Sequence, residues 1–334
     1  MGFSIEMLNQ IRTNASAEYQ NRIPEATREN FSTIGYALQN YELLFNEYAT
    51  ALFGKIGKTI ICQKLFKNPL AKYKTGSILT QQDVEEIFVG MGNSAEQYDP
   101  DGKTVKARRK FDNTKAVYHR MNRRDMYAIS IGDLDFVRVF QSEATHDAFV
   151  TAKLNAVYTR ANYDEWVIMK NTIATYDGYF DYGVPALDGT NNETACKTFV
   201  KTLRKAVNDL SIGMPSAYNK AKVECNTEKA NMVLLVHKDL IAEIDVEVLA
   251  KAFNMGKTDI EVSIEVMDDF GTLTDTYGIL MDKEWFRVYD TLNRMTSDRN
   301  EEGLFTNYFL HIHQIHSASP FKNAVRFTTK AVTV

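Results

Sequence analysis

Half of the six histidines in this 334-residue chain lie close together near its C-terminus. They are His311, His313 and His316, in the segment YFLHIHQIHSAS. Imidazoles bind transition metals and titrate near neutral pH, so the cluster could hold a metal ion or respond to acid. If the segment is a strand, side chains alternate between its faces, and only His311 and His313 share one. That pair is fewer than the three or four ligands that a metal site requires.

A metal-dependent enzyme would need further ligands from elsewhere in the chain. His119, His146 and His237 are candidates, but no H-E-x-x-H or comparably close motif connects them with the cluster. We therefore predict no metal, no cofactor and no catalytic residue, and interpret the cluster as half-buried strand histidines. An enzyme built on the H-x-H pair of His311 and His313 is kept as an alternative.

Other catalytic and targeting signatures are incomplete. FGKIGKT at residues 53–59 resembles a phosphate-binding loop, but Leu52 stands where the motif requires its first glycine. The three cysteines, odd in number and far apart, argue against a disulfide framework and suit a reducing compartment. No apolar run approaches the roughly 18 residues that span a bilayer, so we expect a soluble protein.

Charge is distributed unevenly along the chain, although the net charge is only −4. Residues 103–124 contain nine Lys and Arg and one acid, whereas residues 239–269 contain nine Asp and Glu and two lysines. Opposite patches of this kind attract copies of the same molecule to one another. Charge alone is explained more simply by two solvated faces of one subunit. Of the two binding functions, we place self-association ahead of nucleic-acid binding. Nucleic-acid binding through the basic stretch, which also carries aromatic residues, is a second alternative.

The order of the expected elements indicates an elongated molecule. Residues 1–50 predict amphipathic helical pieces, and residues 62–131 predict a long polar β-arm, which usually exists to contact something. Ser142–Asp177 predicts one helix about 50 Å long, with Ser142 as its N-cap. Beyond it the patterns predict an α/β lobe with helices at 192–210, 239–255 and 283–295 and strands at 232–236, 261–268 and 277–282, followed by two strands that close the chain, at 304–316 and 324–329.

Six segments of the chain, taken together and in order, form a recognisable pattern. They are KNPLAKYKTG (67–76), VEEIFV (84–89), DVEVLAKAFNM (245–255), DKEWFRVYDTLNRM (282–295), GLFTNYF (303–309) and FKNAVRF (321–327). Together they resemble the major capsid (head) protein of small short-tailed bacteriophages of the Picovirinae, or phi29-like, type. The resemblance covers nearly all of the chain after residue 50 and is weakest over residues 1–50 and 177–230.

The resemblance implies an α+β fold of the Hong Kong 97 type. Its parts would be an N-terminal arm at 1–50, an extended β-hairpin arm or E-loop at 62–131, a peripheral domain at 132–190 plus 304–334 with a spine helix at 142–177, and an axial domain at 191–303. Some relatives append an immunoglobulin-like domain, which we do not expect after Val334. Some capsids of this fold also cross-link a lysine to a neighbour's asparagine, and we find no basis for such a pair here.

The function implied is structural and not enzymatic. Copies would form pentamers and hexamers that close into an icosahedral or prolate phage head around packaged double-stranded DNA, after synthesis in the cytoplasm of the bacterial host. The expected partners are other copies, scaffolding, portal and further head proteins, and DNA contacted non-specifically, with no membrane and no small-molecule substrate.

We expect basic residues of the arm to lie over acidic surface of a neighbouring copy. Because an exposed ion pair contributes only ~0–1 kcal/mol, charge would set the orientation of the copies more than the strength of their contact. The predicted inter-subunit contacts are Lys64, Lys67, Lys72, Lys74, Arg108, Arg109 and Lys110.

Overall fold

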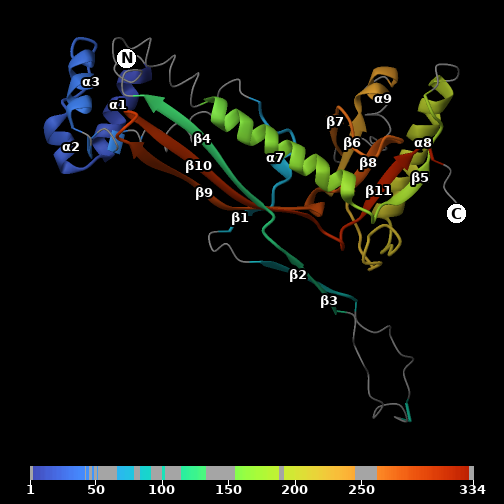
Figure 1. The fold of residues 1–334 in the computed structure, drawn as a ribbon. Helices are drawn as coiled ribbons and strands as arrows, with labels where there is room; N and C mark the ends of the chain where they lie inside the picture. The colour runs from blue at the N-terminus through green and yellow to red at the C-terminus, as the bar shows by residue number, and fades with distance from the viewer. Residues whose placement is uncertain are drawn as a thin grey trace.

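The structure is a computed structural model, and its parts are arranged along one axis. A long β-sheet connects a group of N-terminal helices at one end with an α/β lobe at the other, and a β-hairpin projects from the middle (Figure 1). The described residues are 3–41, 43–44, 47–48, 51, 66–78, 83–91, 100–101, 114–132, 155–187, 192–244 and 262–330.

The long sheet has four strands in the order β1-β9-β10-β4. Strands β9 and β10 pair in antiparallel fashion along nearly their whole length, with an irregularity between His313 and Gln314. The antiparallel partner β4 lies on the other side of β10, and the short β1 runs parallel to β9. The bounds are β1 (Gly76–Ser77), β4 (Arg123–Gly132), β9 (Phe286–Asn300) and β10 (Phe305–Ala318).

The helix predicted at 283–295 is wrong. Only the 3-10 turn η5 (Lys283–Trp285) is helical, and β9 begins directly after it. The apolar residues of this segment fit a helical period as well as a strand period, so the pattern alone is ambiguous. The antiparallel partner β10 decides the outcome, because it supplies backbone hydrogen bonds from Phe286 onward.

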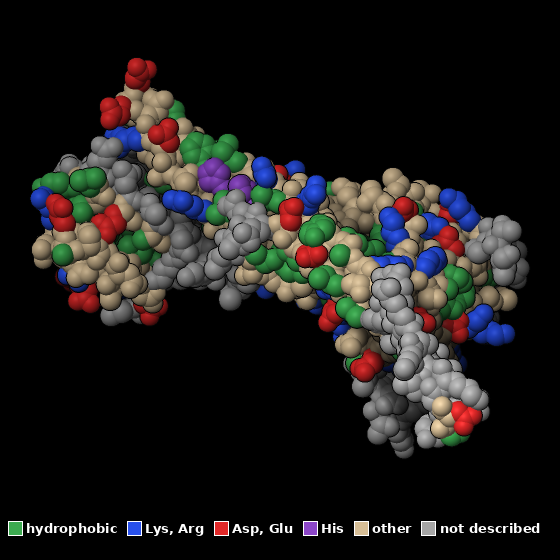
Figure 2. Space-filling view, turned by 90° about the horizontal axis from the view of Figure 1, so that it is seen from below, with side chains coloured by type: hydrophobic (Ala, Val, Ile, Leu, Met, Phe, Trp, Pro, Cys, Tyr) green, Lys and Arg blue, Asp and Glu red, His purple; other side chains and the backbone are tan. Residues whose placement is uncertain are grey.

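The two faces of the long sheet differ. Along β10, residues 306, 308, 310, 312 and 314 are buried, and the residues between them are half-buried. Helix α7 (Asn155–Thr175) packs across β10 and β4 on the buried face. His311 and His313 lie on the opposite face and His316 is buried, which confirms the predicted alternation. Figure 2 shows histidine side chains on the open face.

Among the described residues, the predicted N-terminal helical pieces include three helices, and residues 43–44, 47–48 and 51 are helical as well. Ile5, Leu8 and Ile11, whose spacing puts them on one helix face, are all buried in a common core. That core includes Ile131 of β4 and Tyr308 of β10, so the helices are fixed to the end of the long sheet. Their bounds are α1 (Phe3–Asn14), α2 (Ala17–Arg22) and α3 (Phe31–Asn40).

Helix α7 is the described part of the long helix predicted at 142–177. It ends at Thr175, just before Asp177 and Gly178, as predicted. The expected N-cap Ser142 lies outside the described residues. Met169 and Ile173 of α7 are buried against the lobe, so one helix spans the junction between the long sheet and the lobe. Within the described ranges, no helix combines the length and apolarity that crossing a bilayer requires.

The lobe contains a five-stranded sheet in the order β5-β11-β8-β6-β7. Helices α8 (Asn192–Ser211) and α9 (Lys238–Glu243) share a core with one face, and α7 shares a core with the other. Strand β6 is therefore a continuous apolar run, MVLLV, as expected of a strand covered on both faces. The strand bounds are β5 (Phe180–Gly183), β6 (Met232–His237), β7 (Ser263–Met267), β8 (Thr276–Asp282) and β11 (Ala324–Thr328).

Most of the elements predicted for the lobe are confirmed. The helix predicted at 192–210 and the strands predicted at 232–236, 261–268 and 277–282 correspond to α8, β6, β7 and β8. The closing strand predicted at 324–329 is β11, and it pairs with β8 within the lobe and not outside it. The helix predicted at 239–255 begins as α9, and its remainder from residue 245 lies outside the described residues. Two further 3-10 turns are η2 (Ala71–Tyr73) and η4 (Lys229–Asn231).

Part of the predicted β-arm forms the projecting hairpin. Strands β2 (Val84–Val89) and β3 (Thr114–His119) pair with each other and with no other described strand. The end of the predicted arm, residues 115–131, is divided between two strands, because β3 belongs to the hairpin and β4 to the long sheet. Phe88 stacks on Phe321 at 5.7 Å and so holds the inner face of the hairpin against the body.

Candidate functional site at the base of the hairpin

The base of the hairpin meets the long sheet through a group of polar side chains centred on Glu86. Oxygen Oε1 of Glu86 accepts hydrogen bonds from Nε and Nη2 of Arg287, at 3.1 and 2.6 Å, and from the Ser319 hydroxyl at 2.9 Å. Oxygen Oε2 lies 3.0 Å from Nε2 of His119. Burial favours a raised pKa for Glu86, but these hydrogen bonds outweigh it and lower the pKa to about 2. Glu86 is therefore an anion at any ordinary pH.

His119 extends this group to the end of β10. Its Nδ1 lies 2.7 Å from the hydroxyl of Ser317, which also lies 3.2 Å from the carbonyl oxygen of Arg287. Because Glu86 is an anion, Nε2 of His119 donates to it, so the imidazole connects β2 with the Ser317 hydroxyl at its other nitrogen. We call Glu86, His119, Arg287, Ser317 and Ser319 the hairpin latch.

The chain Ser317, His119 and Glu86 has the connectivity of a hydrolase triad, which the sequence did not reveal. Acyl transfer also requires hydrogen-bond donors aimed at the developing oxyanion. The side-chain amide of neighbouring Asn122 is instead paired with the backbone of His316, since Nδ2 donates one hydrogen to its carbonyl at 2.7 Å and Oδ1 accepts from its N–H at 2.8 Å. Asn122 thereby extends the pairing of β4 with β10. We interpret the hairpin latch as a structural contact that holds the hairpin on the long sheet.

A second polar group lies under α7 and is centred on Glu165, which is 7% exposed. Its carboxylate accepts from Asn68 at 3.0 Å, from Lys74 at 2.9 Å and from Gln314 at 2.7 Å. Burial raises the pKa of Glu165, but Lys74 and the other donors outweigh it, so the pKa is lowered. Asp290 of β9 accepts from the same Lys74 and Gln314, at 2.8 and 2.5 Å. These five residues, the helix anchor, fix α7 to β9 and β10.

Arg123 continues the anchor onto β4. It is 3% exposed and donates to Asp125 at 2.6 Å, to Gln314 at 2.6 Å and to Tyr127 at 2.8 Å. The hydrogen bonds to Asp125 and Tyr127 raise the pKa of Arg123 against the effect of burial. At least this member of the basic stretch 103–124 is therefore an internal structural residue and not part of a basic surface.

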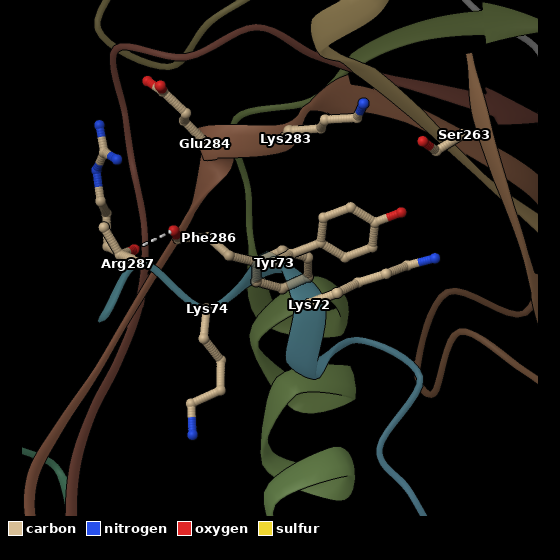
Figure 3. A pocket seen from close by; sticks show the side chains of 9 residues that line it. Lys72, Tyr73, Lys74, Ser263, Lys283, Glu284, Phe286 and Arg287 are labelled. Atoms are coloured by element: carbon tan, nitrogen blue, oxygen red, sulfur yellow. Dashed lines mark hydrogen bonds between the residues drawn. The ribbon is translucent and has the colours of Figure 1, made fainter. Parts of the chain in front are cut away.

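A cavity of about 540 Å³ opens next to the latch, between η2, η5 and the start of β9 (Figure 3). Four cations line it, and each has acceptors within the chain. Arg287 binds Glu86, and Lys74 is turned away from the other side chains toward the helix anchor. Lys72 pairs with Glu265, and Lys283 donates to the carbonyl of Ala230 at 2.6 Å. We therefore interpret this cavity as part of the framework of the subunit.

The seven basic residues predicted at inter-subunit contacts do not share one environment. Lys67 is exposed, and Lys72 is about half exposed and ion-paired with Glu265. Lys74 is mostly covered within the helix anchor. The other four, Lys64, Arg108, Arg109 and Lys110, lie outside the described residues.

The acidic stretch is also partly neutralised from within. Lys170 of α7 reaches Asp268 at 2.9 Å and Asp269 at 2.8 Å. Asp239 and Glu243 of α9 are exposed, while residues 245–261 lie outside the described residues. Among the described residues of this stretch, the exposed carboxylates are therefore those of α9 and of Asp268 and Asp269, the last two shared with Lys170.

The histidines of β10 belong to the framework as well. Nε2 of His311 lies 2.9 Å from the Thr296 hydroxyl of β9, and Nε2 of His316 lies 2.9 Å from Oε1 of Gln314. In the part of the chain that the structure describes, no group of three His, Cys, Asp or Glu side chains has the geometry to hold a metal. The H-x-H pair was the most conspicuous motif of the sequence, whereas the latch and anchor gave no signal because their members are far apart in the chain.

Comparison with known proteins places the chain in a family. Residues 8–328 match the model of the "Phi29-like phage major capsid protein" family. The chain is 34% identical over 331 residues to the major capsid protein of Bacillus phage B103 and 33% identical over 332 residues to that of Bacillus phage PZA. In both comparisons 98% of this chain is aligned with 73% of the relative.

Solved structures extend the comparison to the fold. A chain in the capsid structure of Staphylococcus phage Andhra has a TM-score of 0.58 at 10% identity, over 81% of this chain and 86% of that chain. A chain in the capsid structure of the cyanophage P-SCSP1u has a TM-score of 0.53 at 10% identity, over 81% and 91%. The fold is thus the mixed α+β fold of phage capsid proteins. The relatives are structural proteins and not enzymes, and the chain belongs to the Phi29-like phage major capsid protein family, whose members form the shell of the phage head.

Proposed function

We propose that copies of this chain form pentamers and hexamers that close into an icosahedral or prolate head around packaged double-stranded DNA. The observation that carries this proposal is the outer face of the hairpin. Ile87, Val89 and Tyr118 lie on it, and each is more than half exposed. A two-stranded ribbon is only marginally stable alone, and clustered exposed apolar side chains mark surfaces that bind a partner. The partner is the next copy in the ring.

The parts of the molecule take roles of the Hong Kong 97 type in this proposal. Residues 1–50 are the N-terminal arm, and residues 62–131 include the E-loop, of which β2 and β3 are described. We assign the long sheet and α7, as part of the spine helix, to the peripheral domain, and the five-stranded sheet with α8 and α9 to the axial domain. The bounds expected from the sequence, 132–190 plus 304–334 and 191–303, would divide both sheets, because β9 pairs with β10 and β11 pairs with β8. The elongated shape supports this assignment, because lobe, hairpin and N-terminal helices extend in three directions (Figure 1).

Contacts around a five- or six-fold axis join unlike patches of successive copies. We assign Lys67 and the arm residues Lys64, Arg108, Arg109 and Lys110 to such contacts, over acidic surface such as that of α9. Lys72 joins them through its exposed stem, whereas Lys74 contributes by holding the segment in place. Scaffolding, portal and other head proteins are the further partners, and the packaged DNA is contacted without sequence preference.

Replacing the apolar outer face of the hairpin tests the proposal. Purified wild-type protein, with scaffold supplied if assembly needs it, should form closed shells that can be counted by electron microscopy. The double variant Ile87→Asp, Val89→Asp should fold normally and lose at least about tenfold in shell yield. Ile212→Asp with Met214→Asp is the matched control, since both side chains are exposed on the lobe. Shells formed by the hairpin variant at the wild-type yield would contradict the proposal.

A further inference from the structure

Helix α8 turns a row of cations toward solvent. Lys197, Lys201, Arg204 and Lys205 are all exposed, and they recur at intervals of about one helical turn, so they lie on one side of the helix. Between Thr194 and Leu210 the sequence contains a single acid. The row is therefore a locally basic surface in a chain whose net charge is −4.

That single acid, Asp209, is directed toward the sheet. Its carboxylate accepts from the hydroxyl of Tyr182 on β5 at 2.6 Å and from the hydroxyl of Tyr218 at 3.3 Å. Lys205 lies on the same side of the helix, with Nζ 5.6 Å from the centre of the Tyr182 ring. The row therefore follows the edge of the lobe that β5 forms, beside α8 in Figure 1. Within the described ranges, Lys201 and Lys205 form no ion pair.

This surface differs in kind from the outer face of the hairpin. No described side chain of α8 is a large apolar group exposed to solvent, whereas Ile87, Val89 and Tyr118 are exposed on the hairpin. The cores of protein interfaces are built around apolar and aromatic side chains and are poor in lysine. Surfaces that bind nucleic-acid backbones are polar and rich in Lys and Arg. The row on α8 has the composition of the second kind.

The cations are the hydrogen-bond donors of this surface. The hydroxyls of Thr198 and Thr202 donate within the helix, to the carbonyl oxygens of Thr194 and Thr198 at 2.9 Å each. The row extends about 12 Å from its first to its last lysine, at 1.5 Å per residue. Because double-stranded DNA carries one negative charge for roughly every 1.7 Å of its axis, a duplex lying along the row presents a phosphate to each cation.

The basic surface is limited to α8. Helix α9 shares the core on the same face of the five-stranded sheet, but it exposes Asp239 and Glu243 beside Lys238. A polyanion that approaches this face is therefore attracted to α8 and not to α9.

We propose that the exposed side of α8 faces the inside of the head and binds the phosphate backbone of the packaged DNA, with Lys201 and Lys205 as its main contacts. The inference rests on the proposed function and names the surface that contacts the DNA. Phosphate contacts carry no base information, so the binding is independent of sequence. Charge runs in the sequence do not reveal this surface, because other residues separate the α8 cations and only the helix brings them together.

The salt dependence of DNA binding tests the role of the row. The full-length chain, kept unassembled, is titrated with a short DNA duplex of mixed sequence at several salt concentrations. The logarithm of the binding constant falls with the logarithm of salt concentration by about 0.9 per phosphate contact. Lys201→Gln with Lys205→Gln removes two contacts, so the slope should become shallower by about 1.8.

The matched control is Lys222→Gln with Lys330→Gln, which removes two exposed cations of the lobe outside α8. It should leave the slope unchanged. Equal slopes for the wild-type chain and the α8 variant, or no measurable binding by the wild-type chain, would overturn the inference.

Shell formation separates contact with DNA from contact between copies. In the absence of DNA, the α8 variant should melt close to the wild-type temperature and form closed shells at the wild-type yield. A folded α8 variant that loses its shells would show that the row binds another protein chain, and would overturn the inference.

A density map of DNA-filled heads gives a test that does not depend on variants. The row should line the inner surface, with the outermost layer of DNA against it. A row on the outer surface, or one covered by another protein chain, would overturn the inference while leaving the proposed function intact. Failure of wild-type protein to form shells under any condition would instead contradict the proposed function itself.

Discussion

The carboxylate of Glu86 on β2 and the guanidinium of Arg287 on β9 are joined by two hydrogen bonds across 201 residues of sequence. Both side chains are largely buried, at 14% and 13% exposure. The pair therefore fixes the angle at which the hairpin leaves the body, and with it the position of the outer face that we assign to subunit contacts.

Removing one partner of this pair should destabilise the protein strongly. Glu86→Ala leaves Arg287 buried without its counter-ion, so we expect unfolding to become easier by about 3 kcal/mol. Glu85→Ala is the control, because Glu85 is exposed and should cost less than about 1 kcal/mol. Urea denaturation measures both values. Equal losses from the two variants would show that the latch contributes no more than a surface contact.

The latch should also control local opening of the hairpin. In Arg287→Lys the ammonium keeps the charge but loses the two-pronged contact with Glu86, so the bond network weakens without being abolished. We expect faster amide hydrogen exchange in β2 and β3, with exchange in the lobe strand β6 unchanged. Uniform acceleration in all three strands would indicate a global effect and contradict the role of a latch.

His316 should make stability depend on acid. Burial, together with the nearby cations Arg123 and Lys74, lowers its pKa from 6.5 to about 4, although Glu165 and Asp290 act in the opposite direction. The unfolded state therefore binds a proton at higher pH than the folded state. Stability is unaffected above pH 6.5 and is lost as pH falls to 4, by about 3 kcal/mol in total.

Comparison with His316→Gln isolates this contribution from that of the carboxylates. The stability difference between the wild-type protein and the variant should shrink between pH 7 and pH 4, measured by denaturation at each pH. A difference that stays constant over this interval would mean that His316 titrates normally in the fold.

Relieving backbone strain at Lys222 should stabilise the protein, whereas the substitutions above destabilise it. Lys222 has φ of 52°, a left-handed conformation that costs a residue with a side chain roughly 1–2 kcal/mol. Lys222→Gly removes this cost at some expense in chain entropy, so we expect a gain of about 0.5–1 kcal/mol in unfolding free energy. Lys222→Ala, which keeps the Cβ atom, should give no gain. A glycine variant no more stable than the alanine variant would contradict this explanation.

Local sequence patterns predicted those helices and strands whose spacing of apolar residues matches the faces that the fold buries. Strand β6 is apolar throughout because both its faces are covered, and α8 places Phe199, Leu203 and Val207 in one buried row. Strand β9 could not be predicted in this way, since a segment that suits either period is decided by its partner, and β10 supplies that partner. Local pattern thus fails where a distant strand determines the conformation.

The candidate site could not be predicted from the sequence for a related reason. The latch collects residues 86, 119, 287, 317 and 319, and the anchor collects 68, 74, 165, 290 and 314. No short motif connects them, and charge runs misled the interpretation of Arg123 and Lys74, which are internal residues. Only the alternation of the β10 histidines between the two faces of the strand could be predicted from the sequence, because it depends on strand geometry alone.

The central claim is that the projecting hairpin docks on a neighbouring copy of the chain in a closed shell. A cryo-electron microscopy reconstruction of particles assembled from the purified chain, with scaffold if assembly needs it, tests it most directly. The account predicts that Ile87, Val89 and Tyr118 are covered by the adjacent subunit around each five- and six-fold axis. Closed shells in which this face of the hairpin is in contact with solvent alone would contradict it.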